Sequence, residues 1–254
     1  MPDDARDAVL SGAATWLRLE DYERDYHLEQ FDRPLGYATA LIDFLREHTV
    51  LGDGARCRVL DVGTGAGANL GWMSRAFSGC EFVGVDINEE LLALGAPRLA
   101  EFSGVRLLKA DALDLGSLGP FDLVVSLQLL SWLSEGELGR ALAEQMCAAR
   151  LGVAATALVS QRSADYLIEV CDHGAGKTKP VTILSEQTLA AMASEADWAL
   201  TRVEPFSLTA DLPDEGLARD IFTRRMYDGT NLAFAGDLFL PQCCALFEPT
   251  GGSR

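Results

Sequence analysis

Three glycines at alternate positions follow a short, mainly apolar segment within residues 59–69, VLDVGTGAGAN. Residues 59–62 are typical of a buried strand, and a helical spacing of apolar residues begins at Asn69. Glycine suits the turn between them because it adopts positive φ without strain and has no Cβ to keep a ligand away from the backbone. The start of the helix adds N–H groups without intrahelical partners and the positive end of a dipole. The sequence therefore predicts a turn that holds a polar ligand.

Two classes of protein use a turn of this kind. Gly63, Gly65 and Ala68 fit the fingerprint G-x-G-x-x-G/A of dinucleotide-binding proteins, and Asp86 lies at about the distance where an acid that binds ribose is expected. A nicotinamide-dependent oxidoreductase is therefore one interpretation. The spacing of the glycines alone does not separate it from the other.

Asp61 and Gly67 extend the pattern to D-x-G-x-G-x-G, which resembles motif I of the class I S-adenosylmethionine-dependent methyltransferases. Residues 82–87, 107–112 and 121–126 resemble the second, third and fourth strands of that family, in order and with ordinary spacing. The resemblance covers residues 35–160 or so. Four motifs in register favour this family, of the type that acts on small molecules, over a dehydrogenase.

The resemblance implies S-adenosyl-L-methionine as the cofactor, S-adenosyl-L-homocysteine as its product, and specific roles for the residues that follow the strands. Asp86 would accept hydrogen bonds from the ribose diol, and Ile87 would pack on the adenine face. Asp111 would accept the adenine amino group, while the backbone N–H of Ala112 reads a ring nitrogen. The full set of cofactor-binding residues expected on this basis is Asp61, Gly63, Thr64, Gly65, Asn69, Asp86, Ile87, Asp111, Ala112 and Ser126.

Several of these residues have a simpler interpretation. Asn69 lies in the first turn of a predicted helix, where a capping role is the alternative to a contact with the amino-acid part of the cofactor. Asp111 could be an ordinary turn aspartate. Ser126 and Gln128 are polar in an otherwise apolar run, so burial would oblige them to find partners. By the resemblance they line the floor beneath the reactive methyl group, and Gln128 is a candidate catalytic residue.

Two tyrosines complete the candidate catalytic set together with one histidine. Tyr22 and Tyr26 are one helical turn apart in a stretch with helical apolar spacing, so both can face one cavity. By the resemblance, residues 1–34 would form a helical cap over cofactor and substrate; the alternative is that the stretch only packs on the domain. His173, in a loop at residues 171–180, is the best-placed histidine by elimination, since His27 and His48 fall in predicted helices.

Composition excludes several classes of partner. The chain has 254 residues, with 38 acidic and 21 basic side chains and a formal charge of −17. Nucleic acid and anionic membranes are therefore disfavoured. No apolar run approaches the ~20 residues of a membrane span, and the acidic start of the sequence does not resemble a signal peptide, which favours the cytoplasm. Six cysteines without C-x-x-C spacing predict no metal site.

The expected fold class is α/β. The resemblance predicts a Rossmann-like sheet of seven mostly parallel strands, an antiparallel C-terminal strand and helices on both faces. Residues 1–34 would be the cap, and residues 35–254 the methyltransferase domain with a C-terminal strand pair. Residues 232–247 are expected to form a long strand or a hairpin around 236–237, and residues 171–180 a flexible loop, either a solvated hairpin or an insertion that covers the substrate.

The function expected from this pattern is methyl transfer to a small molecule by in-line displacement, catalysed mainly by positioning. The chain would act as a monomer or a homodimer. Two alternatives remain open: an enzyme that attacks another carbon on the sulfonium, by cyclisation or aminocarboxypropyl chemistry, and a partner protein that binds the cofactor without turnover.

Overall fold

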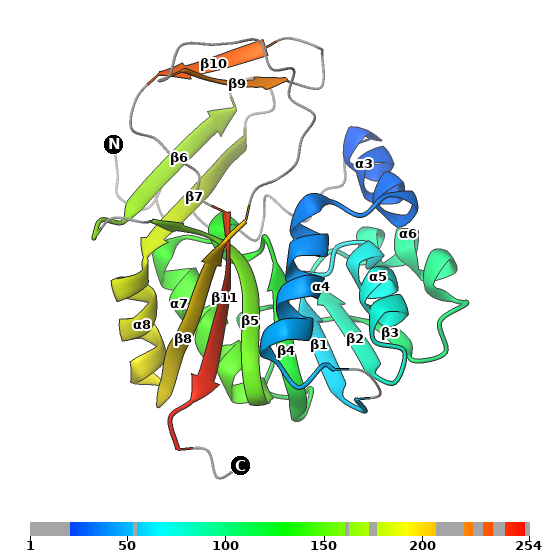
Figure 1. The fold of residues 1–254 in the computed structure, drawn as a ribbon. Coiled ribbons are helices and arrows are strands. Elements are labelled where there is room, and N and C mark those ends of the chain that lie inside the picture. Colours follow the sequence, from blue (N-terminus) through cyan, green and yellow to red (C-terminus); the bar gives the residue numbers. More distant parts are fainter. Residues whose placement is uncertain are drawn as a thin grey trace, which may run out of the picture.

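One large sheet carries the fold (Figure 1). The structure is a computed structural model that describes residues 21–52, 55–160, 163–172, 177–206, 221–225, 231–235 and 242–251.

Seven strands form the main path of the sheet. In spatial order they are β3 (Val105–Lys109), β2 (Glu81–Asp86), β1 (Arg58–Val62), β4 (Phe121–Leu127), β5 (Ala149–Ser160), β11 (Gln242–Pro249) and β8 (Trp198–Pro205).

The direction of the strands confirms the predicted sheet. The five strands from β3 to β5 are parallel to their neighbours. β11 lies between β5 and β8 and is antiparallel to both. The strands of the parallel part are nearly continuous apolar runs, as expected where helices cover both faces of a sheet.

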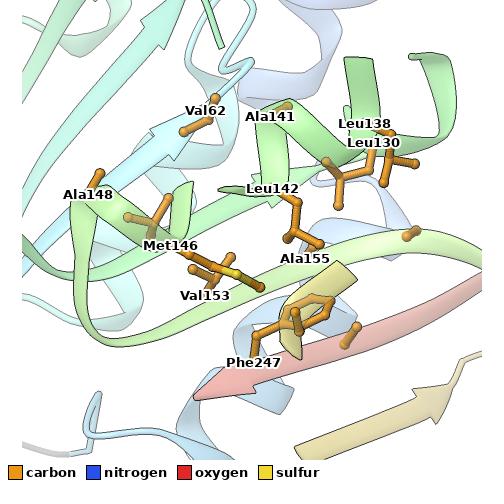
Figure 2. Close-up of a cluster of buried hydrophobic side chains, with 14 of the residues drawn as sticks. Val62, Leu130, Leu138, Ala141, Leu142, Met146, Ala148, Val153, Ala155 and Phe247 are labelled. Atoms are coloured by element: carbon orange, nitrogen blue, oxygen red, sulfur yellow. The ribbon is translucent and has the colours of Figure 1, made fainter. Parts of the chain in front are cut away.

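Two hydrophobic cores lie on opposite faces of this sheet. One contains side chains of α4 (Gly36–His48) and α5 (Ala68–Ala76), and the other contains side chains of α7 (Glu135–Ala148) and α8 (Glu186–Glu195). Figure 2 shows part of the second core, in which Leu142 and Met146 of α7 meet Val153 of β5 and Phe247 of β11. Helices therefore cover both faces, as predicted.

The remaining helices lie near the ends of the parallel strands. α6 (Glu89–Leu99) follows β2, a short 3-10 helix η1 (Leu130–Trp132) follows β4, and α3 (Asp21–Asp32) precedes α4. Asn88 caps α6 as its sequence position predicts, since its side chain accepts hydrogen bonds from the N–H groups of Glu90 and Leu91. None of the described helices is both long and apolar enough to cross a membrane.

Two expectations about the second half of the chain were wrong or incomplete. Residues 171–180 are not only a loop: their described ends belong to strands β6 (Tyr166–Asp172) and β7 (Lys177–Ser185), which pair antiparallel as in the hairpin that was one of the two alternatives, and β7 also joins the end of β5. The expected hairpin within residues 232–247 does not form, because β10 (Asn231–Ala235) pairs with β9 (Ile221–Arg225) and not with β11.

Helix α3 and the β6–β7 strand pair both lie past the same end of the parallel strands. Figure 1 shows α3 at the upper right and the β6–β7 pair at the upper left, both beyond the ends that the strands reach at their carboxyl side. Ligands of open α/β sheets bind at the carboxyl ends of the strands. The residues that follow β1, β2, β3 and β4 at this end are therefore the candidates for a site.

Candidate functional site

The glycine turn between β1 and α5 is held against β2 by its own backbone. Gly63, Gly65 and Gly67 have φ values of 74°, 59° and 82°, the region that glycine adopts without strain. The N–H groups of Gly63 and Thr64 both donate to the carbonyl oxygen of Val85, each at 2.9 Å. The turn is therefore fixed to the end of β2 before any ligand binds.

Side chains from several elements lie close to the positions that β-carbons would take on the three glycines of the turn. A β-carbon on Gly63 would lie 3.0 Å from Leu129, in the loop after β4, and one on Gly67 would lie 2.7 Å from Leu99 of α6. One on Gly65 would lie 3.1 Å from Cε1 of His27, in α3. The turn is thus packed from below by α6 and the β4 loop, and from the side of α3 by a histidine.

Asp86, at the end of β2, is bonded to the turn. Its Oδ2 accepts a hydrogen bond from the N–H of Gly65 at 2.8 Å, and its Oδ1 accepts one from the N–H of Asn88 at 2.9 Å. Burial raises the pKa of Asp86, and these backbone bonds oppose that shift. A carboxylate has about four acceptor positions. The carboxylate can therefore still accept a hydrogen bond from hydroxyl groups such as those of a ribose diol.

Asp61 lies beneath the turn and is buried. Its Oδ2 accepts a hydrogen bond from the hydroxyl of Thr64 at 2.7 Å, and its Oδ1 has no partner among the described residues. Burial raises its pKa to about 7, against which the Thr64 bond acts. A buried acceptor without a partner beside a glycine turn fits a site for a polar or cationic ligand group.

We expect Asp61→Asn to remove a pH dependence of stability. Burial raises the pKa of Asp61 from the ordinary 3.8 of an aspartate to about 7 in the folded protein, so the folded state holds the proton over a range where the unfolded chain has lost it. The free energy of unfolding should therefore fall as the pH rises from about 4 to about 7, by a few kcal/mol at most.

Urea unfolding of both proteins between pH 4.5 and 8 measures this effect. The difference between wild type and Asp61→Asn isolates Asp61 from other titrating groups, since they are common to both proteins. Parallel pH profiles for the two would show that Asp61 keeps an ordinary pKa.

The residues after β3 lie next to Asp86. The N–H of Ala110 donates to the carbonyl oxygen of Asp86 at 3.2 Å, which sets the two strand ends side by side. Oδ1 of Asp111 accepts a hydrogen bond from the N–H of Leu113 at 2.9 Å, so this residue does form the local turn that was the alternative interpretation. Ala112 and Ile87 are half-buried. The adenine-binding role of these residues and of Asp111 stays a prediction.

Gln128 and Ser126 occupy different environments after β4. Gln128 has φ of 59°, a left-handed conformation that is uncommon for a residue other than glycine. Its side-chain nitrogen donates to Oγ1 of Thr156 at 3.2 Å and to Oε1 of Gln242 at 2.7 Å, which ties the end of β4 to β5 and β11. Such strained conformations gather at functional sites.

Ser126 points to the face of the sheet opposite to Asp61. It lies on the same face as Val124, which belongs to the core under α7, whereas Asp61 lies on the same face as Val59 of the core under α4 and α5. Its hydroxyl is fully buried and has no partner among the described residues. The cofactor-binding role of Ser126 stays a prediction.

The remaining predicted residues are only partly described. Asn69 lies half-buried in the first turn of α5, close in sequence to the glycine turn. Tyr26 lies half-buried in α3, and its ring meets that of His27 edge to face with centroids 5.4 Å apart. Tyr22 is in the same helix, but its side chain is outside the described part of the structure, as is the whole of His173.

Two residues at the site were missed by sequence reasoning. His27 was set aside because it falls in a helix, yet that helix brings its ring against Gly65. Gly95, in the middle of α6, is where a β-carbon would overlap the carbonyl oxygen of Ala66 in the turn. A glycine inside a helical pattern costs stability and can mark close packing, so the sequence could have indicated a close contact at Gly95. Nothing in the sequence around His27 indicates a contact with the turn.

No metal site is evident where the structure can be inspected. The described residues contain no group of three or more His, Cys, Asp and Glu side chains able to hold an ion. The five described cysteines, at positions 57, 80, 147, 243 and 244, are free thiols.

Comparison with known proteins gives one family match, and it covers the residues around this site. Residues 59–151 match the model of a family described as a methyltransferase domain. This range begins in β1, contains the glycine turn, Asp86 and Asp111, and ends in β5. No curated protein matches the sequence.

Solved structures share the fold at low sequence identity. The 1,6-didemethyltoxoflavin-N1-methyltransferase of Burkholderia thailandensis, with bound 1,6-didemethyltoxoflavin and S-adenosylhomocysteine, superposes with a TM-score of 0.58 and 15% identity over 89% of this chain and 87% of that one. The Synechocystis magnesium protoporphyrin IX methyltransferase with bound S-adenosylmethionine gives 0.55 and 13% over 98% of both chains. The 4+2 cyclase SpnF gives 0.52 and 22%, over 65% of this chain and only 58% of that one.

Proposed function

Because the chain carries a methyltransferase domain of the class I, Rossmann-like type, we propose that it transfers the methyl group of S-adenosylmethionine to a small-molecule acceptor. The observation that carries this proposal is the bond between the carboxylate of Asp86 and the N–H of Gly65. It joins the acid after β2 to the glycine turn after β1 and leaves acceptor positions for a ribose diol. Solved neighbours with this fold bind S-adenosylmethionine or S-adenosylhomocysteine.

The chain's residues would divide the work of holding the cofactor. Asp86 would accept the two ribose hydroxyls, and Asp111 would accept the adenine amino group beside it. Asp61, buried with one oxygen unpartnered among the described residues, would attract positive charge toward the turn. When bound, S-adenosylmethionine supplies an electrophilic methyl group on its sulfonium.

The protein's contribution to the transfer would be positioning. An in-line displacement needs the acceptor atom held about 3–3.5 Å from the methyl carbon and aligned with the breaking bond. Gln128 lies at the end of β4, where both hydrogens of its amide are used by Thr156 and Gln242. Its carbonyl oxygen is then the atom of this side chain that can orient an O–H or N–H of the acceptor.

The acceptor itself is proposed only as a class. The charge of −17 and the absence of any basic run argue against nucleic acid and favour a neutral or cationic small molecule. Residues 1–34, of which α3 is described, would act as a cap over the site, and the β6–β7 pair would form its opposite wall.

Mass spectrometry of S-adenosylmethionine incubated with the protein tests the proposal. S-adenosylhomocysteine should form only when a metabolite extract is added, together with a metabolite whose mass increases by one methylene group. Asp86→Ala, incubated in parallel, should give neither product.

The same experiment separates the alternatives. Methylthioadenosine formed by the protein alone would show attack at another carbon on the sulfonium and contradict methyl transfer. Binding without any product in extracts would contradict turnover and support a cofactor-binding partner. One solved structure with this fold is a cyclase. A third outcome is therefore that a compound of the extract rearranges while S-adenosylmethionine is not consumed, which would also contradict methyl transfer.

A further inference from the structure

The side chain of His27 lies beside the position that a β-carbon would take on Gly65. A β-carbon there would lie 3.1 Å from Cε1 and 3.4 Å from Nδ1 of the imidazole. The ring is therefore packed close to the second glycine of the turn, where a larger residue would crowd it. No other side chain is within 4 Å of that position in the described part of the chain.

The same ring interacts electrostatically with the carboxylate of Asp86. Burial raises the pKa of Asp86, and the interaction with His27 acts against that rise. Since Oδ2 of Asp86 is bonded to the N–H of Gly65, the imidazole and the carboxylate lie on two sides of the same glycine and form one surface of the turn. That surface carries the atoms to which the proposed function assigns the ribose.

The position of His27 is set by a docked helix. One turn further along α3, the carbonyl oxygen of Gln30 accepts a hydrogen bond from Nε1 of Trp72 in α5 at 2.8 Å. Asp32 pairs with Arg98 of α6 at 3.4 Å, and the guanidinium of Arg98 lies over the ring of Phe31. Contacts with two helices thus hold α3 in register above the glycine turn.

We propose that His27 is a cofactor-positioning residue, whose imidazole closes the ribose site on the side of α3 and contacts the sugar held by Asp86. This inference rests on the proposed function, because it concerns the same cofactor. It adds a residue from outside residues 59–151, so the cap would take part in binding the cofactor as well as covering it. The other role open to His27 is to pack α3 on the turn without touching a ligand.

Calorimetric titration of His27→Ala with two ligands distinguishes these roles. S-adenosylhomocysteine and adenosine share the ribose and differ in the amino-acid part. If His27 contacts the sugar, the Kd of both should rise by the same factor, about tenfold, as expected for the loss of one hydrogen bond in a charged network. A loss confined to S-adenosylhomocysteine, or no change for either ligand, would overturn the proposal.

Trp72→Phe is the matched control for a purely structural effect. It removes the bond to Gln30 that anchors α3 but leaves His27 and the turn in place. It should lower the thermal midpoint while changing both Kd values by less than a factor of two. Equal losses of affinity in Trp72→Phe and His27→Ala would show that docking of α3, and not the imidazole, accounts for the effect.

A second measurement uses the wild-type protein and so does not depend on the folding of a variant. The chain has three histidines, and the imidazole resonance of His27 is identified by its loss in His27→Gln. Adenosine should shift this resonance, whereas an unshifted signal at saturation contradicts the contact. If wild type binds neither ligand, the proposed function itself fails; if it binds both and His27→Ala binds them equally well, only this inference fails.

Discussion

Gly95→Ala should abolish cofactor binding and destabilise the fold, although Gly95 lies in a helix and would touch no ligand. Its β-carbon would overlap the carbonyl oxygen of Ala66 and lie 2.6 Å from the carbonyl carbon. These are backbone atoms of the glycine turn, which bonds to Val85 and Asp86 fix to the end of β2. Either α6 or the turn must therefore move.

The expected sign is opposite to that of helix propensity. In an unhindered helix interior, alanine is more favourable than glycine by about 1 kcal/mol. Overpacking of a close contact costs about 1–3 kcal/mol or more. Gly95→Ala should therefore lower the free energy of unfolding and raise the Kd of S-adenosylhomocysteine at least about a hundredfold, as judged by urea unfolding and calorimetry.

Gly139→Ala is the matched control, since Gly139 also lies inside a helix. The atoms nearest to its β-carbon belong to the side chain of Met192, at 3.7 and 3.9 Å, an ordinary contact. This change in α7 should leave cofactor affinity unaltered and raise stability slightly. Wild-type affinity in Gly95→Ala would show that the turn tolerates the shift.

Asp86→Ala should have the other large effect, a loss of cofactor affinity of about 10²–10⁴-fold. Hydrogen bonds to a charged group contribute about 1.5–3 kcal/mol each, and the proposed ribose diol makes two. The change also removes the acceptor of the Gly65 and Asn88 N–H groups, which leaves the turn less well fixed. Calorimetry with S-adenosylhomocysteine measures the loss.

Asp122→Ala separates the effect on binding from the effect on stability. Asp122 likewise accepts a hydrogen bond from a backbone N–H, that of Arg58 at 2.8 Å, but at the opposite end of the strands. Both variants should unfold more easily than wild type, and only Asp86→Ala should lose affinity. Retained binding in Asp86→Ala would contradict the assignment of the ribose site.

The parts of the site that were predictable are those encoded locally. The glycines of the turn could be predicted because glycine is the residue type that adopts positive φ without strain. The position of Asp86 at the end of a strand could be predicted because it comes directly after an apolar run. The mostly parallel sheet with an antiparallel C-terminal strand followed from the family resemblance and is confirmed. In each case a short stretch of sequence contains the whole signal.

The parts that were missed depend on contacts between distant segments. Residues 232–247 suggest a hairpin from composition and a central Gly-Asp pair, yet β10 pairs with the preceding strand β9, and β11 pairs with β5 and β8, which are far away in sequence. His27 reaches Gly65 only because α3 docks on α5 and α6. The left-handed conformation of Gln128 is supported by Thr156 and Gln242, which no local pattern connects to it.

The place of β11 between β5 and β8 has a consequence for how the protein is made. A chain emerges from the ribosome N-terminus first, so β5 and β8 both exist before the strand that joins them. Until then, β5 has an open edge along residues 153–158, and open edges invite pairing with other chains. The glycine turn and its parallel strands can assemble early, but Gln128 acquires Gln242 only when β11 inserts. Synthesis thus passes through a stage in which the nascent chain holds a formed cofactor turn and is most prone to aggregation.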